Sequence, residues 1–67
     1  MITGIVTWFD PERGVGTIAV EGTDRRFAVR SSDIDGGGRQ SLRPNDRVRF
    51  TASDELDGAR AIHVWVP

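Results

Sequence analysis

Apolar and polar residues alternate along five short stretches of the chain, residues 2–9, 15–20, 26–30, 47–52 and 59–66. Alternation with a period of two is the pattern of a strand that buries one of its faces. No stretch keeps a helical period over the roughly ten residues that a helix needs. The pattern therefore predicts an all-β protein with five strands.

The segment D-P-E-R-G, residues 10–14, joins the first two stretches and predicts a β-hairpin. Asp10 and Pro11 are residue types that start turns. Gly14 is free to adopt the positive φ that residues with a side chain avoid. The first two strands are therefore expected to pair with each other.

Alternation also predicts which side chains face the interior. We expect those of Ile2, Val6, Phe9, Ile18, Val20, Val48 and Phe50 to point inward, and those of Val15, Thr17 and Ala19 to point outward. Trp8 breaks the alternation of the first strand, as it would if the strand bends or bulges there, and Thr7 is expected to be exposed. In the last strand Ile62, Val64 and Val66 form one face, and Ala61, His63 and Trp65 form the other, outward face.

The third strand fits two registers. In the first, Phe27 and Val29 point inward while Arg26, Ala28 and Arg30 point outward. In the second, shifted by one residue, Phe27 is exposed and Arg26 is buried without an evident partner. Burying an unpaired guanidinium is costly. The first register is favoured for that reason, and the second stays open as an alternative.

A long connection, residues 31–44, precedes the fourth strand. Ser32 or Asp33 is expected to cap a short helical turn there. Ile34 is expected to fill one end of the core. The three glycines at 36–38 predict a mobile loop.

The totals allow one domain, residues 1–67, with a small core. The chain has no cysteine, so it forms no disulfide and offers no thiolate. No apolar run approaches the roughly 18–20 residues that cross a bilayer, and the N-terminus does not resemble a signal peptide. We therefore expect a soluble, cytoplasmic protein.

Charge is distributed unevenly around a formal net charge of −1. Residues 13–49 hold eight arginines against five acids, a local +3, while residues 1–12 and 50–67 each carry −2. All nine basic residues are arginine, whose planar guanidinium pairs with phosphate and stacks on bases. This choice suits nucleic acid, and it equally fits a proteome biased towards arginine.

Four blocks of the sequence, taken in order, carry a family resemblance. They are W-F-D-P-E-R-G-V-G-T-I (8–18), F-A-V-R-S-S-D-I (27–34), S-L-R-P-N-D-R-V-R-F (41–50) and, more loosely, D-G-A-R-A-I-H-V (57–64). They resemble W-F-N-x-x-K-G-F-G-F-I, V-F-V-H-F-S-A-I, T-L-x-E-G-Q-x-V-x-F and K-G-P-x-A-x-x-V of the bacterial cold-shock proteins. The resemblance implies a small five-stranded antiparallel barrel of the OB class that binds single-stranded RNA and DNA.

The positions that differ from the family are those that it uses for binding. Val15 and Thr17 stand where two phenylalanines would stack, and Ala28, Arg30 and Ser31 stand where phenylalanine, histidine and phenylalanine would be. Arg39 replaces a loop aromatic, Thr7 a lysine and Asp10 an asparagine, while Trp8 is kept and Arg13 stands for a lysine. The candidate nucleic-acid-binding residues are Trp8, Arg13, Val15, Thr17, Ala28, Arg30 and Arg39.

The substitutions predict weak binding. An OB-type face stacks bases on aromatic rings at about 1–3 kcal/mol per base along a positively charged track. Losing about four rings removes on the order of 4–12 kcal/mol of gross contact energy, and every 1.4 kcal/mol is tenfold in affinity. We therefore expect weak, electrostatic, salt-sensitive and sequence-tolerant binding of single-stranded nucleic acid.

A second function stays open, in which the barrel is a protein-interaction module that has lost nucleic-acid binding. Trp8 beside the small side chains of Val15, Thr17 and Ala28 would then contact a protein partner. Trp65, on the last strand, would provide a second surface. We expect a monomer, with an edge-strand dimer as the alternative.

No catalysis, metal or cofactor is expected. His63 is the only histidine, and no second histidine or cysteine is available to share a metal. Ser31 or Ser32 with Asp33 and His63 fits a catalytic triad by spacing alone, and these are also ordinary turn and surface residues. Residues 14–19 fit G-x-G-x-x-A, but a strand is predicted after them where dinucleotide binding needs a helix.

Overall fold

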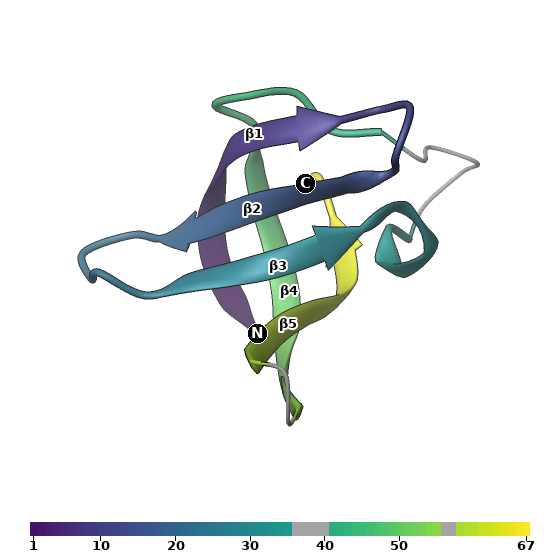
Figure 1. Ribbon diagram of the computed structural model, residues 1–67. Coiled ribbons are helices and arrows are strands. Elements are labelled where there is room, and N and C mark those ends of the chain that lie inside the picture. The colour runs from purple at the N-terminus through teal and green to yellow at the C-terminus, as the bar shows by residue number, and fades with distance from the viewer. Residues whose placement is uncertain (36–40, 56–57) are drawn as a thin grey trace.

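The computed structural model describes residues 1–35, 41–55 and 58–67. Its strands are β1 (Ile2–Asp10), β2 (Val15–Val20), β3 (Arg26–Arg30), β4 (Arg47–Glu55) and β5 (Gly58–Trp65), with one turn of 3-10 helix, η1 (Ser31–Asp33), after β3 (Figure 1). The all-β prediction is confirmed. Within the described ranges, no helix is both long and apolar enough to span a membrane.

The strands close into a barrel in the order β1-β2-β3-β5-β4. Four contacts, β1–β2, β2–β3, β1–β4 and β4–β5, are antiparallel, as expected. The remaining contact, β3–β5, is parallel and consists of the single pair Ala28 and Arg60. Directions cannot alternate all the way round a ring with an odd number of strands, so one neighbouring pair must be parallel.

The predicted extents of the strands hold for β2 and β3 and differ slightly elsewhere. β1 extends to Asp10 because that residue pairs with Val15. β4 continues to Glu55 because its last residues pair with the beginning of β5, as far as Glu55 opposite Gly58. These extensions come from pairing between strands, which the residues at a strand end do not reveal by themselves.

The bulge predicted near Trp8 is present in β1. Val6 pairs with Ile18 and Trp8 with Thr17, so Thr7 is the extra residue between the two pairs. The Thr7 side chain is exposed, and its hydroxyl donates a hydrogen bond to the carbonyl of Thr17 at 3.1 Å. The bulge reverses the alternation, which lets Val6 point inward and Trp8 outward on the same strand.

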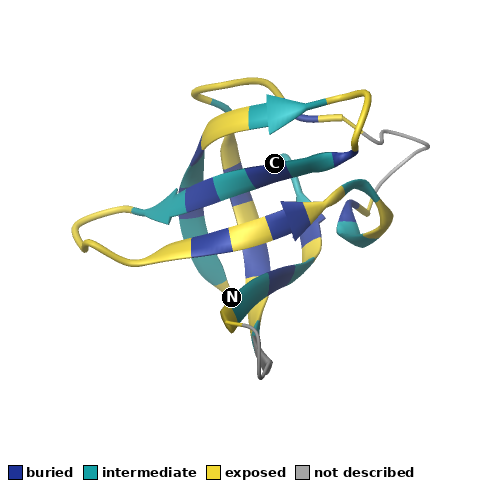
Figure 2. Cartoon of the chain, viewed as in Figure 1, coloured by how far each residue is buried: buried dark blue, intermediate teal, exposed yellow. Residues whose placement is uncertain are grey.

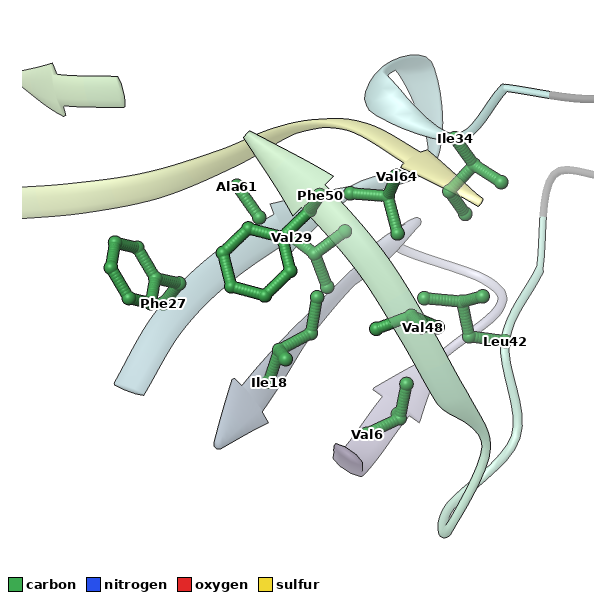
Figure 3. Packing of buried hydrophobic residues seen from close by; sticks show 10 residues of the cluster. All are labelled: Val6, Ile18, Phe27, Val29, Ile34, Leu42, Val48, Phe50, Ala61 and Val64. Atoms are coloured by element: carbon green, nitrogen blue, oxygen red, sulfur yellow. The ribbon is translucent and has the colours of Figure 1, made fainter. Parts of the chain in front are cut away.

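The core is a cluster of ten buried apolar residues, Val6, Ile18, Phe27, Val29, Ile34, Leu42, Val48, Phe50, Ala61 and Val64 (Figure 3). Phe27 and Phe50 contact each other with ring centroids 5.1 Å apart and planes tilted by 60°. Phe27 is 1% exposed, and Figure 2 shows buried and exposed residues alternating along β3. The first of the two registers considered for this strand is therefore confirmed.

The faces predicted for the last strand are wrong at Ala61. This side chain is fully buried rather than outward, and Ile62, expected beside Val64, is half-buried. The cause is an irregularity at His63, which has a φ of 50°. Thr51 pairs with Ile62 and Arg49 with Trp65, so two residues of β5 lie opposite Phe50. The extra residue reverses the alternation, so that both Ala61 and Val64 point inward.

The connection between β3 and β4 contributes two buried residues to the core, Ile34 and Leu42. Ile34 is buried as predicted and pairs in parallel with Val64. Leu42, which the alternation did not assign to the core, is 3% exposed. The predicted cap is wrong, because Arg30 precedes η1 and no side chain caps it. Asp33 instead binds Arg60 of β5, as described below. The glycine loop at 36–38 lies outside the described residues.

Candidate nucleic-acid interface

The outer side of β1, β2 and β3 brings most of the candidate residues together. In the cross-strand register, Trp8 lies beside Thr17 and Thr17 beside Ala28, while Asp10 lies beside Val15 and Val15 beside Arg30. Neighbouring strands are about 4.8 Å apart, and same-face residues of one strand about 6.8 Å apart. These side chains therefore form one patch. We call it the binding face: Trp8, Asp10, Val15, Thr17, Ala28 and Arg30, with Arg13 and Arg26 at its margins.

Trp8 is the one ring on this face. Its exposed fraction is 49%, whereas Phe27 and Phe50 are buried in the core and Phe9 and Trp65 are half-buried. These are all the aromatic residues of the chain. Trp65 also carries the guanidinium of Arg49 over its ring, 5.7 Å from the centroid. Only Trp8 therefore offers an open platform on which a base can stack.

A glycine lets β2 approach β1 closely next to Trp8. A Cβ on Gly16 would lie 2.5 Å from the carbonyl oxygen of Trp8, so only glycine fits between the two strands. The neighbouring residues Val15 and Thr17 are half-buried and point to the other side. Together with the exposed Ala28, they give the face a floor of small side chains beside the indole ring.

The arginines divide into two groups. In the first group, Arg47 pairs with Glu21 at 2.7 Å, and Arg60, which lies beside Ala28, donates from Nε and an Nη to the two oxygens of Asp33 at 3.0 and 3.1 Å. On the face, Arg26 and Arg30 are exposed and form no ion pair with any residue in the described ranges. The positive charge of the face is therefore available to a ligand.

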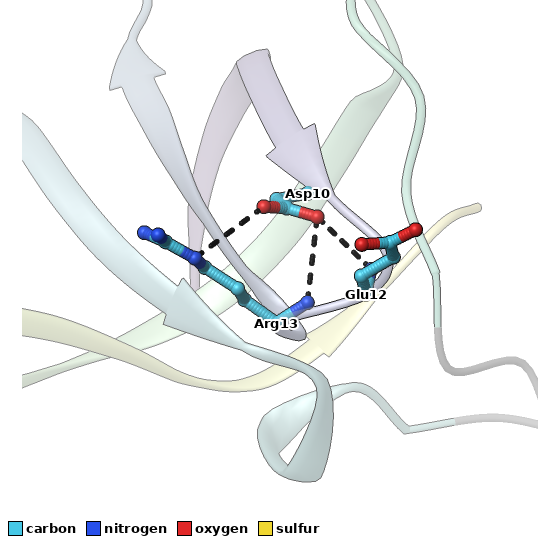
Figure 4. A network of polar contacts seen from close by, with 3 residues as sticks. All are labelled: Asp10, Glu12 and Arg13. Carbon is cyan, nitrogen blue, oxygen red and sulfur yellow. Dashed lines mark hydrogen bonds and ion pairs between the residues drawn. The ribbon is translucent and has the colours of Figure 1, made fainter.

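Arg13 is held at the edge of the face by the hairpin turn (Figure 4). Asp10 Oδ1 accepts hydrogen bonds from the backbone N–H groups of Glu12 and Arg13 at 3.0 and 3.4 Å. The backbone carbonyl of Asp10 accepts a hydrogen bond from the backbone N–H of Gly14 at 2.8 Å. Gly14 has the predicted positive φ, 68°. The Arg13 side chain is 81% exposed, with Nε 3.8 Å from Asp10 Oδ2.

Sequence reasoning overlooked Arg26 as a site residue. It pairs with Ala19, on the same outward series of β3 as Ala28 and Arg30. The period of two that placed Arg30 on this face also places Arg26 there, so the signal was present in the sequence. Arg39, in contrast, lies outside the described residues.

The structure does not assemble the triad that the spacing of serine, aspartate and histidine allowed. Asp33 is engaged by Arg60, and His63 Nδ1 lies 3.3 Å from Asp35 Oδ2, not from Asp33. Among the described residues there is also no group of three or more histidine, aspartate or glutamate side chains that could hold a metal ion.

Comparison with known proteins agrees with the fold. The family model of the "Cold-shock" DNA-binding domain matches residues 2–67. The chain belongs to the cold-shock domain family. Members of this family generally bind nucleic acid, and the resemblance noted in the sequence is confirmed.

Several cold-shock proteins are similar to this chain over nearly its whole length. It is 41% identical to the major cold shock protein of Micrococcus luteus, with 96% of each chain covered. It is 36% identical to a cold shock protein of Arthrobacter globiformis, again with 96% of each covered, and 33% identical to the cold shock-like protein CspI of Escherichia coli, with 94% and 90% covered.

The fold also matches a solved structure, Drosophila Unr CSD456, with a TM-score of 0.79. The match covers 98% of this chain and 26% of that one at 18% identity. At this identity the match supports the OB-type barrel of the cold-shock domain and nothing finer.

Proposed function

We propose that this cold-shock domain binds single-stranded RNA or DNA weakly, more through charge than through stacking, and with little dependence on sequence. The observation that carries the proposal is the make-up of the binding face. One exposed ring, Trp8, lies among arginines that are exposed at its margins, Arg13, Arg26 and Arg30. We place this activity in the cytoplasm, with the monomer as the binding unit.

Stacking contributes little to this binding because one ring accommodates one base. A base on Trp8 gains about 1–3 kcal/mol. The bases on either side would lie over Val15, Thr17 and Ala28, which offer contact area but no aromatic surface. Such a floor does not distinguish one base from another, because it presents few hydrogen-bonding groups to the base edges.

Charge contributes more, through the phosphates. Each phosphate that an arginine neutralises releases condensed counterions, and log K falls with log salt by about 0.7 per phosphate on a single strand. Arg13, Arg26 and Arg30 would together give a slope of about 2. The guanidinium fork suits phosphate because it donates two parallel hydrogen bonds to one group.

The proposal is tested by titrating labelled oligothymidine with the protein at several salt concentrations. We expect dissociation constants in the micromolar range or weaker at low salt, and near-complete loss of binding at moderately raised salt. Tight binding that resists salt and strongly quenches tryptophan fluorescence would contradict the proposal, because it would require stacking on more than one ring.

A second candidate function is protein recognition through the same face. Its support is the half-exposed Trp8 next to small side chains and flanked by arginine, since tryptophan and arginine are frequent anchors at protein interfaces. Absence of oligonucleotide binding even at low salt would favour this candidate. A pull-down with the wild-type protein and with Trp8→Ala, analysed for RNA and protein together, separates the two functions.

A further inference from the structure

A carboxylate lies on the face that we propose to bind phosphates. Asp10 follows Trp8 by two residues on β1, beyond the bulge, and pairs with Val15 in the same row as Arg30. Its side chain is 36% exposed. A negative charge at this position repels the nucleic-acid backbone, so it lowers affinity unless it contacts a different part of the ligand.

The two oxygens of Asp10 have different surroundings. Oδ1 accepts the backbone N–H groups of Glu12 and Arg13 and thereby holds the turn. Oδ2 accepts no hydrogen bond from a described residue and lies 3.8 Å from Arg13 Nε. The Arg13 side chain is 81% exposed, and ion pairs this exposed are weak. Oδ2 is therefore able to accept hydrogen bonds from a ligand.

The spacing places this oxygen at the edge of a base that stacks on Trp8. Same-face residues two apart on a strand are separated by about 6.8 Å, which is comparable to the width of a base. A carboxylate only accepts hydrogen bonds, so it attracts base edges that carry N–H groups and repels carbonyl oxygens. Guanine presents two adjacent donors, N1–H and N2–H. Thymine and uracil present one donor, N3–H, between two carbonyls.

We propose that Asp10 is a specificity-determining residue, which favours guanine over thymine or uracil on Trp8 by accepting its N1–H and N2–H groups. This inference rests on the proposed function and refines it: one base is read and the others are tolerated. Binding of the base edge displaces Arg13 from Oδ2, and the guanidinium is then available to a phosphate of the same strand.

The experiment compares three heptamers: heptathymidine, the same strand with a central guanine, and the same strand with hypoxanthine, which lacks the N2 amino group. We expect the guanine strand to bind about fivefold more tightly than heptathymidine, because charged acceptors form stronger hydrogen bonds than neutral ones. The hypoxanthine strand should lie between them. A guanine-to-thymine ratio near one in the wild type would overturn the inference.

Asp10→Asn tests the residue itself. The amide oxygen keeps an acceptor for the two backbone N–H groups of the turn, so the fold should be retained, and a thermal melt checks this. We expect heptathymidine to bind more tightly, because the repulsion is removed, and the guanine-to-thymine ratio to fall to about one, because the contact to guanine is lost. A ratio that stays at the wild-type value would overturn the role of Asp10.

Glu12→Gln is the matched control, because it removes the same charge from the same turn. The Glu12 carboxylate forms no hydrogen bond or ion pair with Asp10 or Arg13, and only the backbone N–H of Glu12 contacts Asp10 (Figure 4). It should tighten binding of every strand alike and leave the guanine-to-thymine ratio unchanged; a ratio that falls as it does in Asp10→Asn would overturn the base-reading role. If no strand binds at low salt, the proposed function fails together with this inference. If the strands bind without preference, only the inference fails.

Discussion

The three strands that carry the binding face, β1, β2 and β3, also line the interior of the barrel, yet aromatic residues are placed differently on the two sides. Inside, Phe27 of β3 packs against Phe50 at 5.1 Å, and both rings are buried. Outside, the neighbour of Phe27 on β3 is Ala28, and the one exposed ring is Trp8 of β1. The alternation of side chains separates the two surfaces by a single residue along the chain.

The comparison shows which constraint acts on each surface. The interior must be filled, because an empty volume inside a small barrel removes much of its stability. The outer face does not have to be filled, because a small side chain on the surface leaves no cavity inside the protein. Aromatic residues on the outside are therefore not required to fill the core, and the face of this protein has one ring and several arginines.

The largest effect is expected inside. Phe27→Ala should cost about 3–5 kcal/mol through lost burial and an internal cavity. The stability margin of so small a barrel is itself about 3–5 kcal/mol, so the variant should be largely unfolded in buffer. Urea denaturation followed by far-UV circular dichroism measures this. Ala28→Ser, one residue along, is the control and should keep a near-wild-type midpoint. A Phe27→Ala protein as stable as the wild type would remove the distinction between the two surfaces.

A smaller effect is expected from adding a ring outside. Ala28→Phe places an aromatic in the row of Trp8 and Thr17, where it offers a second stacking platform. It should tighten binding of oligothymidine by about 1–3 kcal/mol, which is roughly 5- to 150-fold. Ala28→Leu adds apolar area without a stacking surface and is the matched control. Equal gains in the two variants would show that apolar contact, not stacking, is what the face lacks.

Much of the fold follows from the sequence because the period of two is uninterrupted in β2, β3 and β4 and is broken at only one place each in β1 and β5. The bulge at Trp8 was predictable, since two large apolar residues follow each other there. The one at His63 was not, because apolar residues stand on both sides of it and fit either face of the strand, and only the pairing with Arg49 and Thr51 requires an extra residue. Leu42 was missed for a related reason: it lies in a connection, where no alternation marks the buried side.

The positions of most candidate residues could be predicted, and their electrostatics could not. The outward positions of Val15, Thr17, Ala28 and Arg30 follow from strand alternation, and that of Trp8 follows from the bulge. The sequence does not show which arginines are unpaired and available to a ligand, because Arg60 pairs with Asp33 and Arg47 with Glu21 across long separations in the chain. Only the folded barrel shows that Arg47 and Arg60 are paired with acids and that Arg30 has no partner among the described residues.

The central claim, that binding at this face depends on guanidinium charge, is tested most directly by the salt dependence of oligothymidine binding in Arg30→Gln. Arg49→Gln is the control, since Arg49 lies over Trp65 on another part of the barrel. The account predicts that Arg30→Gln lowers the slope of log K against log salt by about 0.7, while Arg49→Gln leaves it nearly unchanged. An unchanged slope in Arg30→Gln, or an equal loss in both variants, would contradict it.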